Sequence, residues 1–220
     1  NTIQKRIYIR TVFCMKSSFH LIDLNLHLPV YYSVDFKKFY DEPLGSASMA
    51  QVHKAILKSG EVVVIKIQRP GIVEVMSRDM GLLRKATSLL SLANVGGGAL
   101  DFNIILDEMW KASQQELDFL HEVRNAQEFY KLNMDNPFVA CPKVYPCIST
   151  AEVIVMEFID GVQVDDIDKL KSLGYDLKDI GNRLAENYGK QILEDGFFHA
   201  DPHPGNIKIR NEEIVWIDMG

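Results

Sequence analysis

The sequence lacks several features that would place it in a familiar class of protein. It has no run of about 18 or more apolar residues, so no membrane-spanning helix is expected within it. Its cysteines, Cys14, Cys141 and Cys147, form no CxxC pair, which argues against a zinc site and favours small core residues in a reducing compartment. The net charge of −6 leaves no basic excess for nonspecific nucleic-acid binding.

The order of predicted elements favours an α+β fold over a repeating βαβ sheet. Strands are expected at 51–57 and 61–68, joined as a hairpin around Lys58-Ser59-Gly60. Helical spacing of apolar residues predicts helices over 72–93, 101–133 and 176–195, the last closed by Gly196. A strand is expected in EVIVMEFIDG, residues 152–161, and a final hairpin around Asn211.

The segment GSASMAQVHKAILKSGEVVVIKIQ, residues 45–68, has the spacing of the phosphate loop GxGxxGxV but keeps only its first glycine. Lys66 follows on an apolar run, where such loops are followed by a lysine-bearing strand. Alanine adds a methyl group and restricts the loop, so we expect the phosphates to be held differently and Ala47→Gly to change the ATP/ADP preference. The residues expected to contact the nucleotide are Gly45, Ser46, Ala47, Ser48, Ala50, Val52 and Lys66.

The segment FFHADPHPGNIKIRNEEIVWIDMG, residues 197–220, supplies the other groups that phosphoryl transfer needs. Asp201 and Asn206 have the spacing of H-R-D-x-x-x-x-N, and Asp218-Met219-Gly220 stands where D-F-G would. Such transfer depends on a lysine on the phosphates, a carboxylate that orients the acceptor and oxygen ligands for magnesium. We therefore expect Lys66 and Asp201 to be catalytic, and Asn206 and Asp218 to bind the metal.

Two other functions remain open at this point. His199, Asp201 and His203 alternate, and such a cluster could bind the metal of a hydrolase, although that hypothesis gives Lys66 no role. A nucleotide-binding pseudokinase scaffold would use the same site without turnover. Asp201, Asn206 and Asp218 are all present, which favours turnover.

The motifs HADPHPGN, PLGSASMAQVHKA, VVIKIQRPG and QELDFLHEVRN resemble those of the UbiB/AarF/ADCK-type atypical kinase family over residues 36–220, and bacterial members most. The resemblance implies a protein-kinase-like two-lobe fold with inserted helices. Residues 1–35 would be a segment of unclear structure, 36–158 the N-lobe and 159–220 part of a C-lobe. Because the chain stops just after Asp218-Met219, we expect that lobe to be truncated.

The resemblance also implies an atypical kinase or ATPase that uses ATP or ADP with Mg²⁺ or Mn²⁺. Expected partners are a lipid or isoprenoid-quinone precursor and a membrane surface, with a cytoplasmic location peripheral to the inner membrane and no nucleic acid. Glu157 and Phe158, at the position of a kinase hinge, are expected to present backbone groups to adenine.

The acid that pairs with Lys66 is expected on the helix over 101–133. Asp118 and Glu122 are four residues apart and would share one face of that helix, whereas Glu116 would point about 200° away from Asp118. We predict that Glu122 pairs with Lys66 and that Asp118 lies beside it.

Overall fold

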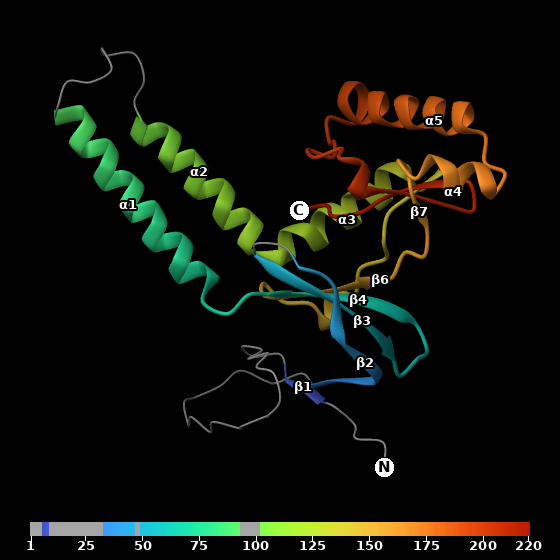
Figure 1. Ribbon diagram of the computed structural model, residues 1–220, viewed down its shortest axis with the longest axis horizontal. Coiled ribbons are helices and arrows are strands. Elements are labelled where there is room, and N and C mark those ends of the chain that lie inside the picture. The colour runs from blue at the N-terminus through green and yellow to red at the C-terminus, as the bar shows by residue number, and fades with distance from the viewer. Residues whose placement is uncertain (1–5, 9–32, 47–48, 93–101) are drawn as a thin grey trace.

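The computed structural model describes residues 6–8, 33–46, 49–92 and 102–220. These residues form two β-sheets, each with its own apolar core, and a pair of long helices that extends away from both (Figure 1). The mixed α+β fold predicted from the sequence is confirmed. No helix among these residues is long and apolar enough to cross a membrane.

The first sheet has the strand order β1-β2-β3-β4-β6 and is antiparallel throughout. The hairpin predicted around Lys58-Ser59-Gly60 is confirmed, and Gly60 supplies the positive φ of 99° that its turn requires. The 14-residue strand β2 was not predicted, because its sequence is polar, contains Pro43 and pairs irregularly with β3. The strands are β1 (Arg6–Tyr8), β2 (Ser33–Ser46), β3 (Ala50–Leu57), β4 (Val62–Gln68) and β6 (Val153–Glu157).

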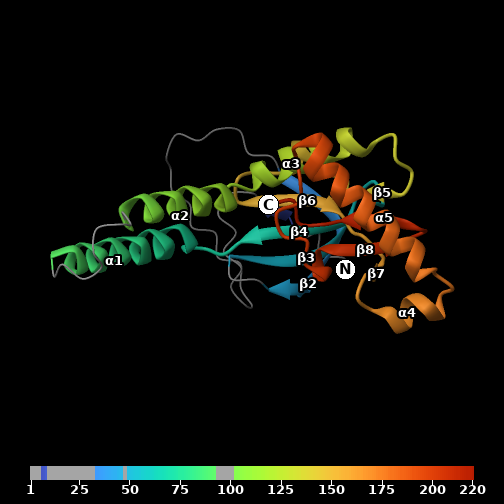
Figure 2. The same cartoon turned by 90° about the horizontal axis from the view of Figure 1, so that it is seen from above.

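Helices α1 (Ile72–Leu92) and α2 (Phe102–Leu117) lie side by side and project from one end of this sheet (Figures 1 and 2). The single helix predicted over 101–133 is wrong, because the chain breaks between α2 and α3 (Phe119–Asn133). Asp118 lies at the break with an extended backbone (φ −100°, ψ 93°), and its side chain accepts a hydrogen bond from Leu120 N–H. This N-cap begins a new helix that apolar periodicity alone does not separate from α2.

The second sheet has the order β5-β9-β8-β7, with α4 (Ile167–Ser172) and α5 (Leu177–Lys190) beside it. Asp176 caps α5, which continues as a π-helical turn, Gln191–Asp195, and ends at Gly196 with φ 63°. The hairpin predicted around Asn211 is confirmed, with positive φ at Asn211 and Glu212. The strands are β5 (Val139–Ala140), β7 (Val162–Gln163), β8 (Ile207–Arg210) and β9 (Glu213–Trp216).

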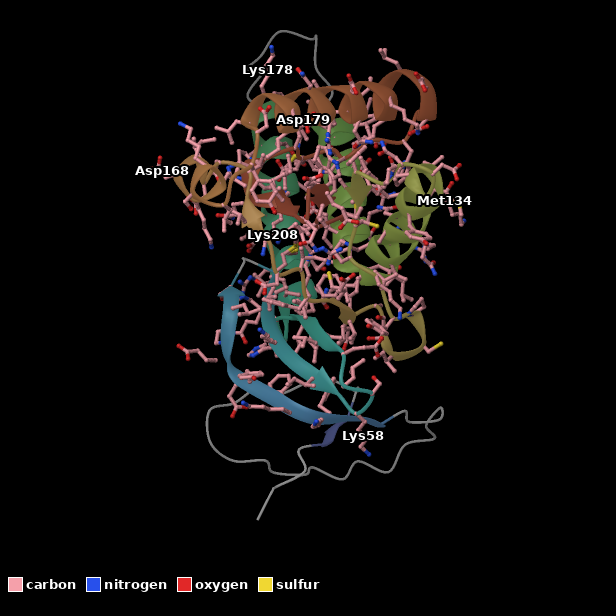
Figure 3. All side chains as sticks on the ribbon, turned by 90° about the vertical axis from the view of Figure 1, so that its right-hand side faces the viewer. Lys58, Met134, Asp168, Lys178, Asp179 and Lys208 are labelled. Carbon is pink, nitrogen blue, oxygen red and sulfur yellow. The ribbon has the colours of Figure 1, made fainter. Side chains whose placement is uncertain are left out.

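Helix α3 connects the two parts of the molecule. Phe119 and Val123 at its beginning pack against β6, whereas Ala126 and Phe129 further along pack into the core of the second sheet. Strand β5 lies within the range assigned from sequence to the first lobe, yet it pairs with β9 of the second sheet. In Figure 3, Lys58 marks the end of the first sheet that lies farthest from the second sheet. Lys178 on α5 marks the opposite end of the view.

The cysteines only partly match their prediction as core residues. Cys141 is buried, and its burial raises the pKa of the thiol to about 12. Cys147 is exposed on the 3-10 turn Pro146–Ile148, so the prediction is wrong for this residue. Cys14 lies outside the described residues.

Candidate active site

Lys66 of β4 lies where α3 and the C-terminal segment meet the first sheet. It is aligned across the sheet with Val52 of β3 and Ile154 of β6. Its neighbours Ile65 and Ile67 belong to the core on the opposite face, so strand alternation directs Lys66 toward α3. Its Nζ donates to Glu122 Oε2 at 2.9 Å and to Asp218 Oδ1 at 2.6 Å, so residues from three distant segments converge here.

Glu122 is the lysine partner that the sequence predicts, and the contact is present. Its side chain is only 5% exposed, in the first turn of α3. Burial raises the pKa of Glu122, and the negative charge of Asp218 adds to the effect, while the charge of Lys66 opposes it. Burial alone would lower the pKa of Lys66, but the charges of Glu122 and Asp218 outweigh it, and that pKa is raised. The lysine is therefore firmly protonated between two carboxylates.

The position predicted for Asp118, beside Glu122 on one helical face, is wrong. Asp118 is the N-cap residue of α3, and its carboxylate lies 3.8 Å from both His121 and Arg124. Glu116, near the end of α2, is exposed to solvent. The prediction failed because it assumed continuous helical geometry through a residue that has extended dihedral angles.

Asp201 and Asn206 lie close together and are connected to Asp218 through the backbone. Asn206 Nδ2 donates to Asp201 Oδ2 at 3.2 Å and to its carbonyl oxygen at 3.1 Å. The Asn206 carbonyl oxygen accepts from the N–H of Ile217, the residue before Asp218. Asp218 itself has φ 63°, a left-handed conformation that is costly for residues other than glycine, Asn and Asp. The loop that carries Asp201 and the loop that carries Asp218 are thus joined directly.

The chemistry of these side chains fits a hard divalent cation. Because Asn206 directs its Nδ2 to Asp201, its Oδ1 is the atom left for a metal, and Asp218 adds a carboxylate that is 52% exposed. Oxygen ligands of this kind suit Mg²⁺ or Mn²⁺.

The metal-hydrolase hypothesis for His199, Asp201 and His203 is not supported. His199 is buried, its Nε2 is 3.0 Å from Ile217 O, and its Nδ1 accepts from Asp201 N–H. His203 Nδ1 accepts from Gly205 N–H. The described part of the chain contains no group of three His, Cys, Asp or Glu residues able to hold a metal ion. Both histidines shape the loop around Asp201.

The predicted phosphate loop is described only in part, because Ala47 and Ser48 lie outside the described residues. Gly45 pairs with Val52, and a Cβ added to Gly45 would meet no atom of the described residues within 4 Å. Ser46 Oγ accepts from Arg69 at 2.5 Å. Ala50 does not face this space: it is 2% exposed and packs with Phe119 and Val123, which corrects its assignment as a nucleotide contact.

The predicted hinge differs from expectation in its hydrogen bonds. The N–H of Glu157 donates to Lys143 O at 2.8 Å, and that of Phe158 donates to Val62 O at 3.1 Å. Neither residue therefore offers an unused N–H to adenine. The Glu157 carboxylate instead binds Arg210 of β8 at 2.6 Å, which connects the end of β6 to the second sheet.

Sequence reasoning missed two groups that shape this site. Asn125 lies three residues after Glu122 on α3, and its Nδ2 donates to Met219 O at 2.8 Å, fixing the backbone next to Asp218. Its spacing from Glu122 placed it on the same face and was the available signal. The second group is three buried amide side chains, Asn133 on α3, Asn187 on α5 and Gln191 on the π-helical turn that follows α5.

Comparison with known proteins agrees with this geometry. A model of the family described as "ABC1 atypical kinase-like domain" matches residues 16–220. The chain is 44% identical over 185 residues to "Uncharacterized protein in hydrogenase 1 5'region" of Clostridium pasteurianum, covering 84% of this chain and 35% of that protein. It is 38% identical to "AarF domain-containing kinase 1" of Drosophila melanogaster, covering 84% of this chain and 36% of the relative.

A solved structure is also similar. The chain matches the protein in "The complex structure of Rv3197-erythromycin from Mycobacterium tuberculosis" with a TM-score of 0.70 and 33% identity, covering 84% of this chain and 46% of that one. The chain spans about a third of the length of the curated relatives that it matches.

Proposed function

Because the chain belongs to the ABC1 atypical kinase-like family, we propose that it binds ATP or ADP with a divalent cation and uses ATP for phosphoryl transfer or hydrolysis. The observation that carries this proposal is the convergence of Lys66, Glu122 and Asp218, with Nζ–O distances of 2.9 and 2.6 Å. A partly buried lysine held by a helix carboxylate beside a metal-binding carboxylate is the arrangement that positions nucleotide phosphates in kinases.

Each side chain then has a role that follows from its position. Lys66 binds the phosphates, and Glu122 fixes the direction of its ammonium group. Asp201 orients the acceptor hydroxyl or water, since its carboxylate is exposed and is held at one oxygen by Asn206. Asn206 and Asp218 would hold Mg²⁺ or Mn²⁺, which neutralises phosphate charge when bound. Besides their 2.6 Å contact with each other, Lys66 would then also bind phosphate and Asp218 would also bind the metal.

The acceptor and the location belong to the same proposal. The family resemblance alone supports a lipid or isoprenoid-quinone precursor as the acceptor and a peripheral position at a membrane. No nucleic-acid partner is proposed.

The test compares wild type with Asp218→Asn in thermal shift and phosphate release, using ATP, ADP and no nucleotide, each with and without Mg²⁺. A ligand at about 100 times its Kd adds about 2.7 kcal/mol to the free energy of unfolding, a shift that is easily measured. We expect Mg²⁺-dependent stabilisation and phosphate release in wild type, and loss of release in Asp218→Asn. Stabilisation without release would indicate a nucleotide-binding scaffold instead, and no response to nucleotide would refute the proposal.

A further inference from the structure

Three amide side chains form a buried hydrogen-bonded cluster between α3 and α5, here called the amide cluster: Asn133, Asn187 and Gln191. Their exposed fractions are 4%, 3% and 0%. Asn187 Nδ2 donates to Asn133 Oδ1 at 2.8 Å, and Gln191 Nε2 donates to Asn187 Oδ1 at 2.8 Å. Asn133 lies at the end of α3, whereas Asn187 lies on α5 and Gln191 opens the π-helical turn that follows it.

The hydrogen bonds of the amide cluster can run in only one direction. Trp216 Nε1, which can only donate, binds Asn187 Oδ1 at 3.0 Å, so the Asn187 amide cannot be reversed. At the other end, the backbone N–H of His199 donates to Gln191 Oε1 at 3.0 Å, which fixes that amide as well. Asn133 Nδ2 completes the set by donating to Phe129 O. The cluster therefore has one fully satisfied arrangement.

The amide cluster ends at both loops of the candidate site. Trp216 precedes Asp218 by two residues, and His199 precedes Asp201 by two. The His199 ring contacts Ile217 O and Asp201 N–H, so it lies between the two loops. A second connection runs beside the cluster, since Lys190 Nζ donates to Leu132 O of α3 and to Asp195 of the π-helical turn. The end of α3, the helix that carries Glu122, is thus joined to both loops.

The surroundings show that the amide cluster is not needed to fill space. Phe129 and Trp216, which form hydrogen bonds with it, belong to a continuous apolar core, in which apolar side chains could occupy the same volume. A buried polar network gives little net stability over such packing, but it allows only one relative position of the parts that it joins. π-helical turns, such as the one that begins at Gln191, are frequent at functional sites.

We propose that Asn133, Asn187 and Gln191 are positioning residues that hold the loops of Asp201 and Asp218 in register with α3. The inference rests on the proposed function, because it assigns these residues an effect on phosphoryl transfer. They touch neither nucleotide nor metal. They act through the backbone at His199 and through the side chain of Trp216.

The test uses Gln191→Met, which keeps a similar volume but removes both amide hydrogen bonds, and Gln191→Glu, which keeps an acceptor for His199 N–H. Phosphate release and nucleotide KM are measured on the full chain. A displacement of the reacting groups by about 1 Å can cost about 100-fold in rate. We expect kcat to fall at least about tenfold in Gln191→Met, with little change in KM, and partial recovery in Gln191→Glu.

Ile180→Ala is the matched control, because Ile180 lies on α5 in the same core and takes no part in the amide cluster. It should lower Tm without lowering kcat. An unchanged kcat in Gln191→Met, or an equal fall of kcat in Ile180→Ala at an equal loss of Tm, would overturn the inference. If Gln191→Met does not fold, Asn133→Leu at the far end of the cluster replaces it, with the same expectation for kcat.

Hydrogen exchange of the backbone at 200–206 and 216–220 separates this inference from the proposed function. If wild type releases no phosphate, the proposed function fails, yet faster exchange in these two loops in Gln191→Met than in Ile180→Ala would still support the positioning role. Equal exchange in the two variants would refute it.

Discussion

Lys66 and Glu122 should respond unequally to removal, although they form one ion pair. Lys66→Met leaves the Glu122 carboxylate, only 5% exposed, without its cation. Removing one partner of a buried pair in this way costs about 3–5 kcal/mol. Glu122→Gln leaves Lys66 beside Asp218, 2.6 Å away, so the ammonium keeps a counter-charge and the cost falls to about 1.5 kcal/mol.

The double variant Lys66→Met/Glu122→Gln provides the sharper comparison. It contains no unpaired buried charge, so we expect it to be more stable than Lys66→Met alone by about 1–3 kcal/mol, even though it carries one more substitution. Urea unfolding of wild type, both single variants and the double variant at neutral pH measures these differences.

The pH dependence of this difference identifies its cause. In Lys66→Met the pKa of Glu122 rises further, because burial still raises it and the opposing lysine is gone. A carboxyl group whose pKa is raised in the folded state does not lower the free energy of unfolding at pH values below its ordinary pKa of 4.5. As the pH rises from there toward the folded pKa, the free energy of unfolding falls. The gap between Lys66→Met and the double variant should therefore shrink between pH 7.5 and pH 5. An equal gap at both pH values, or equal destabilisation by the two single substitutions, would refute the reasoning.

Three further predictions test separate parts of the structure. Asp218→Asn and Asp218→Ala should both abolish phosphate release. The alanine variant should be less stable than the asparagine variant by about 1 kcal/mol in urea unfolding, because φ 63° suits Asn better than Ala. Equal stabilities of the two variants would contradict this. Arg210→Met should lose about 1 kcal/mol through its partly buried ion pairs with Glu157 and Glu213, and a Tm equal to that of wild type would show that these pairs contribute nothing. Gly161→Ala should lower the free energy of unfolding by about 1–3 kcal/mol, because its Cβ would lie 2.9 Å from Ile209 O. Gly181→Ala, with open space among the described residues around it on α5, should raise the free energy of unfolding by about 0.5–1 kcal/mol. The opposite order in chemical denaturation would refute the packing argument.

Local signals in the sequence were sufficient for the hairpins and for the site residues that follow them. Gly60 and Asn211 mark tight turns between β-branched runs, and strand alternation then fixes the face on which Lys66 lies. Strand β2 could not be predicted in this way, since it pairs irregularly and its residues 37, 38 and 41–46 are exposed. Its position depends on pairing with β3, and the register of that pairing shifts at several points between Phe36 and Gly45.

The amide cluster could not be predicted for a different reason. Asn187 and Gln191 occur in an amphipathic segment, where polar side chains ordinarily indicate the solvent face. They are buried only because the end of α3 and the loop at His199 cover that face of α5. The contact between Asn133 and Asn187 joins residues 54 apart in the sequence, which helical periodicity cannot report.

The break at Asp118 explains how Glu122 can serve as the partner of Lys66. In one continuous helix, the backbone N–H groups before Glu122 would all be used within the helix. Because Asp118 instead caps a new helix, Glu122 lies in its first turn, where the helix dipole favours negative charge. Burial raises the pKa of Glu122, and Lys66 at 2.9 Å opposes that effect. The same break turns α2 away from the sheet, which leaves Phe119 free to pack beneath Lys66, with the ammonium 5.3 Å from the ring centre.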